Sequence, residues 1–369
     1  MTRPTSRHTE NPSDASAETT ASSASAADLA RPRHGHPSPA LPGPAHPRLL
    51  LGAYALAPSD PAGEAAFLAG LDRLGVQALE MPLPEPGTAA ETARWVRAHL
   101  PEHVDLVVTA VPRTMQRLAA DPGHGLSSAD LVQRRAALDD LAVLRDLAAR
   151  LSDDAGRPRL VAVELHSAPG PGLGTLTAFR ESLDEVLAWD LGGAHLLVEH
   201  CDALVEGQQP AKGFWPLHEE IAVLRAIVDD AASASRLGVS INWGRSAIEG
   251  RSAHTPVEHV RAAAEAGLLR AVVFSGAAAT PTPWGPAWGD QHIAPRGPDP
   301  ALSVSAGSLL GAAEIVETLE AAAGATLDVV GVKVTARPAG AGVDERLAVA
   351  RASLRLVSEA LGDRTAHDG

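Results

Sequence analysis

Two short segments of the chain carry acidic and imidazole side chains that could transfer protons. Glu164 and His166 end the apolar run that begins at Leu160, and Glu199 lies near the end of the run that begins at His195. A positioned carboxylate can act as a general base, and an imidazole can act as its partner acid or base. The Glu-x-His spacing is ordinary by itself, but its coincidence with Glu199 one strand later favours a functional role.

Lys333 is the third candidate for chemistry. Arginine supplies nearly all of the basic residues, and Lys212 and Lys333 are the two lysines of the chain. Lys333 interrupts an apolar run, where an ammonium group is costly to bury unless it is paired or neutralised. We therefore expect a functional Lys333, which could stabilise a developing oxyanion.

These residues need a scaffold that gathers the ends of separate strands. Residues 159–202 have the pattern strand, loop, helix, strand, which predicts a βαβ unit with two parallel strands. The predicted strands are 48–55, 76–81, 104–111, 160–167, 195–201, 239–243, 271–275 and 329–335. Eight strand–helix repeats predict an α/β protein with a (β/α)8 TIM barrel over residues 47–363. A doubly wound open sheet is the alternative, but no Gly-rich phosphate loop follows the first strand.

The two ends of the chain have a different composition. Residues 1–46 are rich in Ser, Thr, Ala, Pro and His and have little aliphatic content, so we expect a disordered low-complexity tail. Residues 364–369 are expected to be a disordered C-terminus. The tail lacks the apolar core of a secretory signal, which favours a cytoplasmic protein.

Bulk composition excludes several classes of partner. The net charge of −14 and the pI near 5.5 argue against a nucleic-acid surface, which needs clustered positive charge. No run approaches the roughly 18 apolar residues of a membrane span. The single cysteine, Cys201, excludes an intramolecular disulfide and a multi-cysteine zinc site. The expected partner is a small molecule, and the sequence also allows a homo-oligomer.

Strand pleating assigns further side chains to the inside of the barrel. Alternate residues share a strand face, so Glu164 and His166 point inward if Val163 and Leu165 face the helices. In the fifth strand, Glu199 and His200 face opposite ways, and we expect Glu199 to point inward. The same alternation turns these side chains inward: Tyr54, Glu80, Asn242, Ser275, Lys333 and Thr335. A register shift of one residue would reverse any of these assignments.

Two loops add binding residues. The long loop 277–300 contains Trp284, Trp288, Asp290 and His292, and loops of that length are commonly lids or binding loops. We expect its tryptophans to stack on a sugar ring. Arg245, after the sixth strand, belongs to a cationic patch that could hold a carboxylate, phosphate or sulfonate.

Six segments carry a resemblance to a known family. They are GAYA at 52–55, LEMP at 79–82, VELHSAP at 163–169, VEHCD at 198–202, NWGR at 242–245 and WGDQH at 288–292. Through them the chain resembles the xylose-isomerase-like TIM barrels, the sugar phosphate isomerase/epimerase group. More narrowly, it resembles the bacterial family called domain of unknown function 4862. The resemblance covers roughly residues 47–362.

The resemblance also implies a metal site, which this sequence does not reproduce. The superfamily places a carboxylate on strand five, ligands on strands six and seven, and a glutamate on strand eight. Glu199 fits, but Asn242, Ser275 and Lys333 occupy the other places. We therefore expect no metal and no other cofactor. The alternative ligand set, for Mn²⁺ or Zn²⁺, is Glu164, His166, Glu199 and His292.

The resulting functional hypothesis is a sugar or sugar-acid isomerase or epimerase. Proton transfer next to a carbonyl needs a base and an oxyanion stabiliser. The expected base is Glu199 or Glu164, with His166 as its partner and Lys333 with Asn242 as oxyanion stabilisers. The expected substrate-binding residues are Tyr54, Glu80, Asn242, Arg245, Ser275, Trp284, Trp288, Asp290 and His292. The alternatives are a Schiff-base lyase or aldolase through Lys333 and a non-catalytic sugar-binding barrel.

Overall fold

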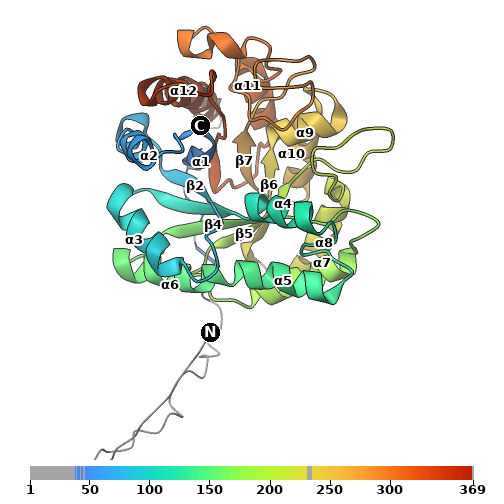
Figure 1. The fold of residues 1–369 in the computed structure, drawn as a ribbon. Helices are drawn as coiled ribbons and strands as arrows, with labels where there is room; N and C mark the ends of the chain where they lie inside the picture. Colours follow the sequence, from blue (N-terminus) through green and yellow to red (C-terminus); the bar gives the residue numbers. More distant parts are fainter. Residues whose placement is uncertain (1–37, 39, 42, 45, 231–234, 368–369) are drawn as a thin grey trace, which may run out of the picture. The chain divides into compact units, whose positions relative to one another are not determined.

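The computed structural model describes residues 38, 40, 41, 43, 44, 46–230 and 235–367 (Figure 1). Most of the predicted tail over residues 1–46 lies outside the described residues, and so do residues 368–369. The disorder predicted for these parts stays a prediction. The barrel was expected to end at residue 363, but this position falls inside a helix that continues to His367.

The strands of the described part form a closed parallel barrel in sequence order, β1 to β8. Their bounds are β1 Arg48–Leu51, β2 Ala78–Pro82, β3 Asp105–Thr109, β4 Leu160–Leu165, β5 His195–His200, β6 Leu237–Asn242, β7 Leu269–Phe274 and β8 Val329–Val332. The barrel closes where β1 pairs with β8, with Leu50 opposite Gly331. This closure confirms the predicted (β/α)8 barrel and excludes the open sheet.

Helices lie around the barrel (Figure 1). Their bounds are α1 Ala53–Leu56, α2 Pro61–Leu68, η1 Leu71–Leu74, α3 Ala89–His99, α4 Val111–Ala120, α5 Leu131–Leu141, α6 Val143–Ala155, α7 Leu176–Leu187, α8 Leu217–Asp230, α9 Trp243–Gly250, α10 Thr255–Glu265, η3 Pro300–Ser305, α11 Ala312–Ala321 and α12 Val343–His367. Their starts follow from local chemistry: Thr175 caps α7 by accepting a hydrogen bond from the Ala178 amide. Among the described residues, none of the helices has the length and apolarity that crossing a membrane requires.

Strand pleating produces two apolar layers. Alternate residues such as Val163, Leu196 and Val198 pack outward into the core that the barrel shares with its helices. The opposite strand face fills the barrel interior, with Leu50, Ala78, Val107, Ala162, Leu197, Ala271, Val273 and Val329. Full burial of such a side chain stabilises a fold by roughly 1.5–3 kcal/mol for valine or leucine. The inner layer therefore makes the barrel a packed core and leaves polar groups to its carboxyl end.

Candidate active site

The candidate site lies where the inner strand faces pass from apolar to ionisable residues. Glu80 follows Ala78 by two residues, Glu164 follows Ala162 in the same way, and Glu199 follows Leu197. A step of two residues keeps a side chain on the same strand face, so the three acids lie directly above the apolar layer of the interior. They line the carboxyl end of the barrel, which we call its mouth. All three acids are buried. His166, Asn242 and Lys333 join them from the ends of β4, β6 and β8.

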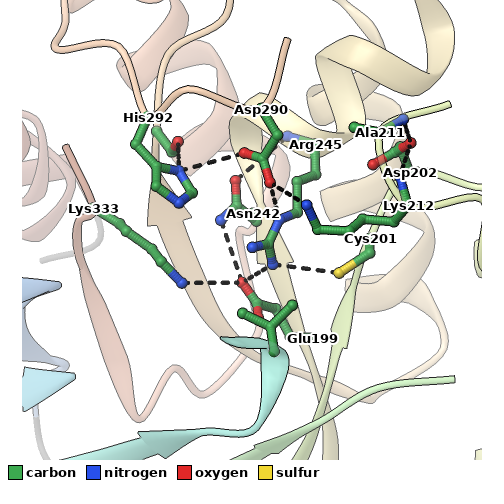
Figure 2. Close-up of polar contacts among 12 residues, drawn as sticks. Glu199, Cys201, Asp202, Ala211, Lys212, Asn242, Arg245, Asp290, His292 and Lys333 are labelled. Atoms are coloured by element: carbon green, nitrogen blue, oxygen red, sulfur yellow. Dashed lines mark hydrogen bonds and ion pairs between the residues drawn. The ribbon is translucent and has the colours of Figure 1, made fainter. Parts of the chain in front are cut away.

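Glu199 is the centre of the polar network (Figure 2). His166 Nε2 lies 2.8 Å from Glu199 Oε2, and Arg245 NH1 lies 2.5 Å from Oε1. Asn242 Nδ2 donates to Oε1 over 3.3 Å, and Lys333 Nζ lies 3.9 Å from the same oxygen. Burial alone would raise the pKa of Glu199, but Arg245 and Lys333 hold it well below its usual range. Glu199 is therefore an ionised and firmly held carboxylate.

Lys333 is a buried cation paired with Glu80. Its Nζ lies 2.6 Å from Glu80 Oε1 and 5.1 Å from the ring centroid of Tyr54. Burial would lower the pKa of Lys333, but the charges of Glu199 and Glu80 raise it well above its usual range. Gly52 makes room for this pair, because a Cβ there would lie 2.8 Å from Lys333 Cγ and 2.9 Å from Glu80 Oε2.

Glu164 differs from the other two acids because its hydrogen-bond partner is a hydroxyl group and not a cation. Ser240 Oγ donates to Glu164 Oε1 over 2.9 Å. Burial and the nearby charges of Glu199 and Glu80 raise the pKa of Glu164 well above its usual range. A pKa raised in this way favours the protonated form of Glu164, which suits an acid better than a base.

Three buried atoms of the site have no hydrogen-bond partner among the described residues. They are Glu80 Oε2, Glu164 Oε2 and His166 Nδ1. A buried polar group without a partner costs free energy, so native structures usually satisfy such groups. A polyhydroxylated ligand offers both donors and acceptors, and it would supply the missing partners.

Asp290 ties the long loop after β7 to the barrel. Its Oδ2 accepts from Lys212 Nζ over 2.9 Å and lies 3.2 Å from Arg245 Nε (Figure 2). His292 Nδ1 lies 3.4 Å from Asp290 Oδ1 and 2.8 Å from Ser275 Oγ. Burial, together with the positive charges of Lys333 and Arg245, lowers the pKa of His292 to about 3, so this imidazole is neutral.

The two loop tryptophans face arginines. Trp284 donates through Nε1 to Thr335 Oγ1 over 2.8 Å, and the Arg337 guanidinium lies 5.6 Å from its ring centroid. The Arg251 guanidinium lies 5.4 Å from the ring centroid of Trp288. One arginine therefore lies against each indole ring, and the stacking of these rings on a sugar stays a prediction.

A cavity of about 510 Å³ borders the site on the side of β1 and β2. Glu80 and Tyr54 line it together with α2 and α3 residues. Much of the remaining wall is apolar, with Leu68, Leu79, Met81 and Trp95 among its residues. The cavity is large enough for a small molecule. The Glu80–Lys333 pair beside it is buried, with side chains 1% and 0% exposed.

The metal site of the superfamily does not fit this arrangement. Lys333 and Arg245 place two positive charges beside Glu199, where a divalent cation would have to bind. Among the described residues, the metal-compatible cluster of the mouth is His166, Glu199 and Cys201. Cys201 Sγ already accepts from Arg245 NH1 over 3.3 Å. The alternative ligand set expected from the sequence is therefore not assembled, since Glu164 and His292 lie outside this cluster.

Some residues of the network were not expected from the sequence. Lys212, which pairs with Asp290, comes from the loop after β5. Ser240, the donor to Glu164, shares a strand face with Asn242, so strand alternation could have identified it. The predicted anion-binding Arg245 is paired with Glu199 and Asp290, and is thus not free to hold a substrate anion in this conformation.

The fold is a closed parallel (β/α)8 barrel, and solved structures with a similar fold include a sugar epimerase and a xylose-isomerase-like TIM barrel. The structure called L-ribulose 3-epimerase has a TM-score of 0.54 at 13% identity, over 88% of this chain and 98% of that chain. A fusion protein of a xylose-isomerase-like TIM barrel and 4-hydroxyphenylpyruvate dioxygenase has a TM-score of 0.52 at 13% identity, over 88% of this chain and 44% of that one.

The family is shown by sequence. Residues 50–349 match the family described as domain of unknown function (DUF4862), and the chain belongs to it. An uncharacterized protein of Salmonella typhimurium is 34% identical over 322 residues, which cover 84% of this chain and 97% of the relative.

Proposed function

We propose that the protein is a sugar isomerase or epimerase that transfers a proton at a carbon next to a carbonyl. The observation that carries this proposal is the buried Glu80–Lys333 pair, which joins an ionisable carboxylate to a charged ammonium beside the cavity that Tyr54 and Glu80 border. The reaction needs this combination of a base and an electrophile. The similarity in fold to L-ribulose 3-epimerase supports the same class of reaction.

Glu80 is the best base among the acids of the mouth. Burial and the charge of Glu199 raise the pKa of Glu80, although Lys333 opposes this shift. A carboxylate with a raised pKa accepts a proton more readily than one with a lowered pKa. Glu199 and Glu164, the bases expected from the sequence, suit the role less because the lowered pKa of Glu199 weakens it as a base and the pKa of Glu164, raised well above its usual range, favours the protonated form.

Lys333 would stabilise the enediolate oxygen that develops when the proton leaves. Its raised pKa keeps the ammonium charged, whereas a Schiff-base nucleophile must be deprotonated. This difference favours the isomerase over the lyase or aldolase. Glu164, whose raised pKa favours the protonated form and whose Oε2 has no partner among the described residues, would return a proton to the substrate. Proton transfer in enzymes commonly uses two titratable groups whose environments give them different pKa values, so that one acts as the base and the other as the acid.

The test is solvent exchange on a panel of aldoses, ketoses and sugar acids in D₂O. We expect deuterium at the carbon next to the carbonyl of at least one sugar, measured by NMR. Glu80→Gln should slow this exchange by about 10²–10⁴-fold, the usual contribution of a general base. Glu91→Gln is the matched control, because Glu91 lines the same cavity but is exposed on α3.

Three results would contradict the proposal. Unchanged exchange in Glu80→Gln would remove Glu80 from the role of base. A sugar that raises the melting temperature without exchange or turnover would identify a non-catalytic sugar-binding barrel instead. Trapping of a sugar adduct by borohydride on Lys333 would establish the Schiff-base reaction.

A further inference from the structure

A second group of imidazole and carboxylate side chains lies on the outer face of β5. His200 follows Glu199 directly, so it points away from the barrel interior and toward the helices. There it meets Glu249 at the end of α9 and His259 on α10. We call His200, Glu249 and His259 the outer histidine cluster.

The outer histidine cluster has the geometry of a ligand set. One ligand atom from each residue lies within 4.8 Å of the others. His200 Nε2 lies 3.0 Å from Glu249 Oε2, and His259 Nε2 lies 3.7 Å from Glu249 Oε1. The second distance is longer than a hydrogen bond, so His259 Nε2 faces the carboxylate without bonding to it.

The remaining polar atoms of the cluster are held by neighbours that would orient them. His200 Nδ1 lies 2.8 Å from Glu220 Oε2, and His259 Nδ1 lies 3.0 Å from Ser246 Oγ. Metal-binding histidines almost always use their second ring nitrogen in this way. The Ala203 amide donates to Glu249 Oε2 over 2.8 Å and leaves Oε1 available.

The charge around this cluster also differs from that of the barrel mouth. Within the described residues, the hydrogen bonds and ion pairs of these three side chains involve no lysine or arginine. His200 is fully buried, whereas the side chains of Glu249 and His259 are each 14% exposed. An ion can therefore enter from the side of Glu249 and His259 and keep a water ligand.

We propose that the outer histidine cluster binds a Zn²⁺ ion through His200 Nε2, Glu249 Oε1 and His259 Nε2. Two imidazoles and one carboxylate are a common three-ligand set for zinc, with water in the fourth position. Glu220 and Ser246 hold the two imidazoles in the required orientation. This site is separate from the proposed proton transfer, because it lies on the opposite face of β5.

The test uses the full-length protein after removal of metals with a chelator. Titration with Zn²⁺ should show one binding event per chain, and Co²⁺ should give visible absorption bands of a low-symmetry site. His259→Asn should abolish both signals. Ser246→Ala should weaken binding by about 10–100-fold, the usual effect of losing a partner that orients a ligand.

Three controls make the outcome decisive. His254→Asn, at an exposed histidine beside α10, should bind as the wild type does. His166→Asn should also bind normally, and loss of binding in this variant would place the ion in the barrel mouth and overturn the proposal. Zn²⁺ should raise the melting temperature of the wild type and leave that of folded His259→Asn unchanged. Absence of zinc binding at micromolar concentration, or its retention in His259→Asn, would also overturn the proposal.

Discussion

Replacement of Lys333 by methionine tests whether the ion pair in the mouth supports both stability and chemistry. Methionine fills a similar volume but removes the ammonium that lies 2.6 Å from Glu80 Oε1. Two unit charges at this distance attract by about 6 kcal/mol in an effective dielectric of about 20. Desolvation offsets much of this attraction, but loss of one partner leaves Glu80 buried and unpaired. We expect Lys333→Met to lower the free energy of unfolding by roughly 3–5 kcal/mol.

The double variant Glu80→Gln/Lys333→Met separates the two contributions. It removes the carboxylate together with the ammonium, so no isolated charge remains on this pair. We expect the double variant to unfold at a higher urea concentration than Lys333→Met, because buried residues in contact are coupled. Urea unfolding curves measure this difference, and equal slopes for the variants would show that the midpoints are comparable.

The stability loss in Lys333→Met should depend on pH. Without Lys333, the folded-state pKa of Glu80 rises further, because burial and the charge of Glu199 act without their counterweight. A raised carboxyl pKa leaves stability intact below the unfolded value of about 4.3 and reduces it as pH rises toward the folded value. The deficit of Lys333→Met should therefore be smaller at pH 4 than at pH 8.

The same variant should lose proton transfer. Loss of one oxyanion-stabilising group typically slows turnover by about 10²–10³-fold. The reasoning is refuted if Lys333→Met unfolds like the wild type, or if the double variant is no more stable than the single one. Full activity of Lys333→Met on a sugar that the wild type converts would refute the electrophilic role.

The remaining predictions concern the other acids of the mouth. Glu164→Gln should change the free energy of unfolding by less than about 1.5 kcal/mol at pH 7, because the raised pKa of Glu164 favours the neutral carboxyl form, which the amide resembles in shape and charge. Glu199→Gln should cost roughly 3–5 kcal/mol, since the buried Arg245 loses one of its two carboxylate partners. Because the folded pKa of Glu199 is lowered, its contribution is present above the unfolded pKa and lost as pH falls, so urea unfolding of Glu199→Gln should depend less on pH below about 4.3. Asp290→Asn should speed amide hydrogen exchange in residues 277–300 by at least about tenfold, because Lys212 and Arg245 lose their charged partner; unchanged exchange would show that other contacts hold this loop.

The sequence predicts the barrel and the direction of the strand side chains because both follow from the spacing of residues that are close together in the chain. A step of two residues from Ala78, Ala162 and Leu197 leads to Glu80, Glu164 and Glu199 on the same faces, and the structure places all three together. The same rule predicts that His200 points outward. The two-residue alternation of each strand therefore identifies which side chains line the mouth.

The pKa values of the acids and the contacts of the loops depend on residues that are far apart in the sequence, so the alternation along a strand does not predict them. Burial and the nearby charges of Glu199 and Glu80 raise the pKa of Glu164, whereas Arg245 and Lys333 hold the pKa of Glu199 below its usual range. Lys212 reaches Asp290 from 78 residues away through a loop without regular alternation. The choice of base therefore needed the structure.

The pairing of charges in the mouth also bears on substrate selection. Within its described residues, Glu80, Glu199 and Asp290 balance Lys333, Arg245 and Lys212. Because each of these cations is already paired with a carboxylate, none of them is free to pair with a charged ligand. An incoming carboxylate would therefore have to break an existing ion pair. A neutral ketose avoids this cost and should raise the melting temperature more than the sugar acid of the same carbon skeleton. The barrel would then discriminate against anionic ligands through the cost of an unpaired charge, and not through the size or shape of the ligand.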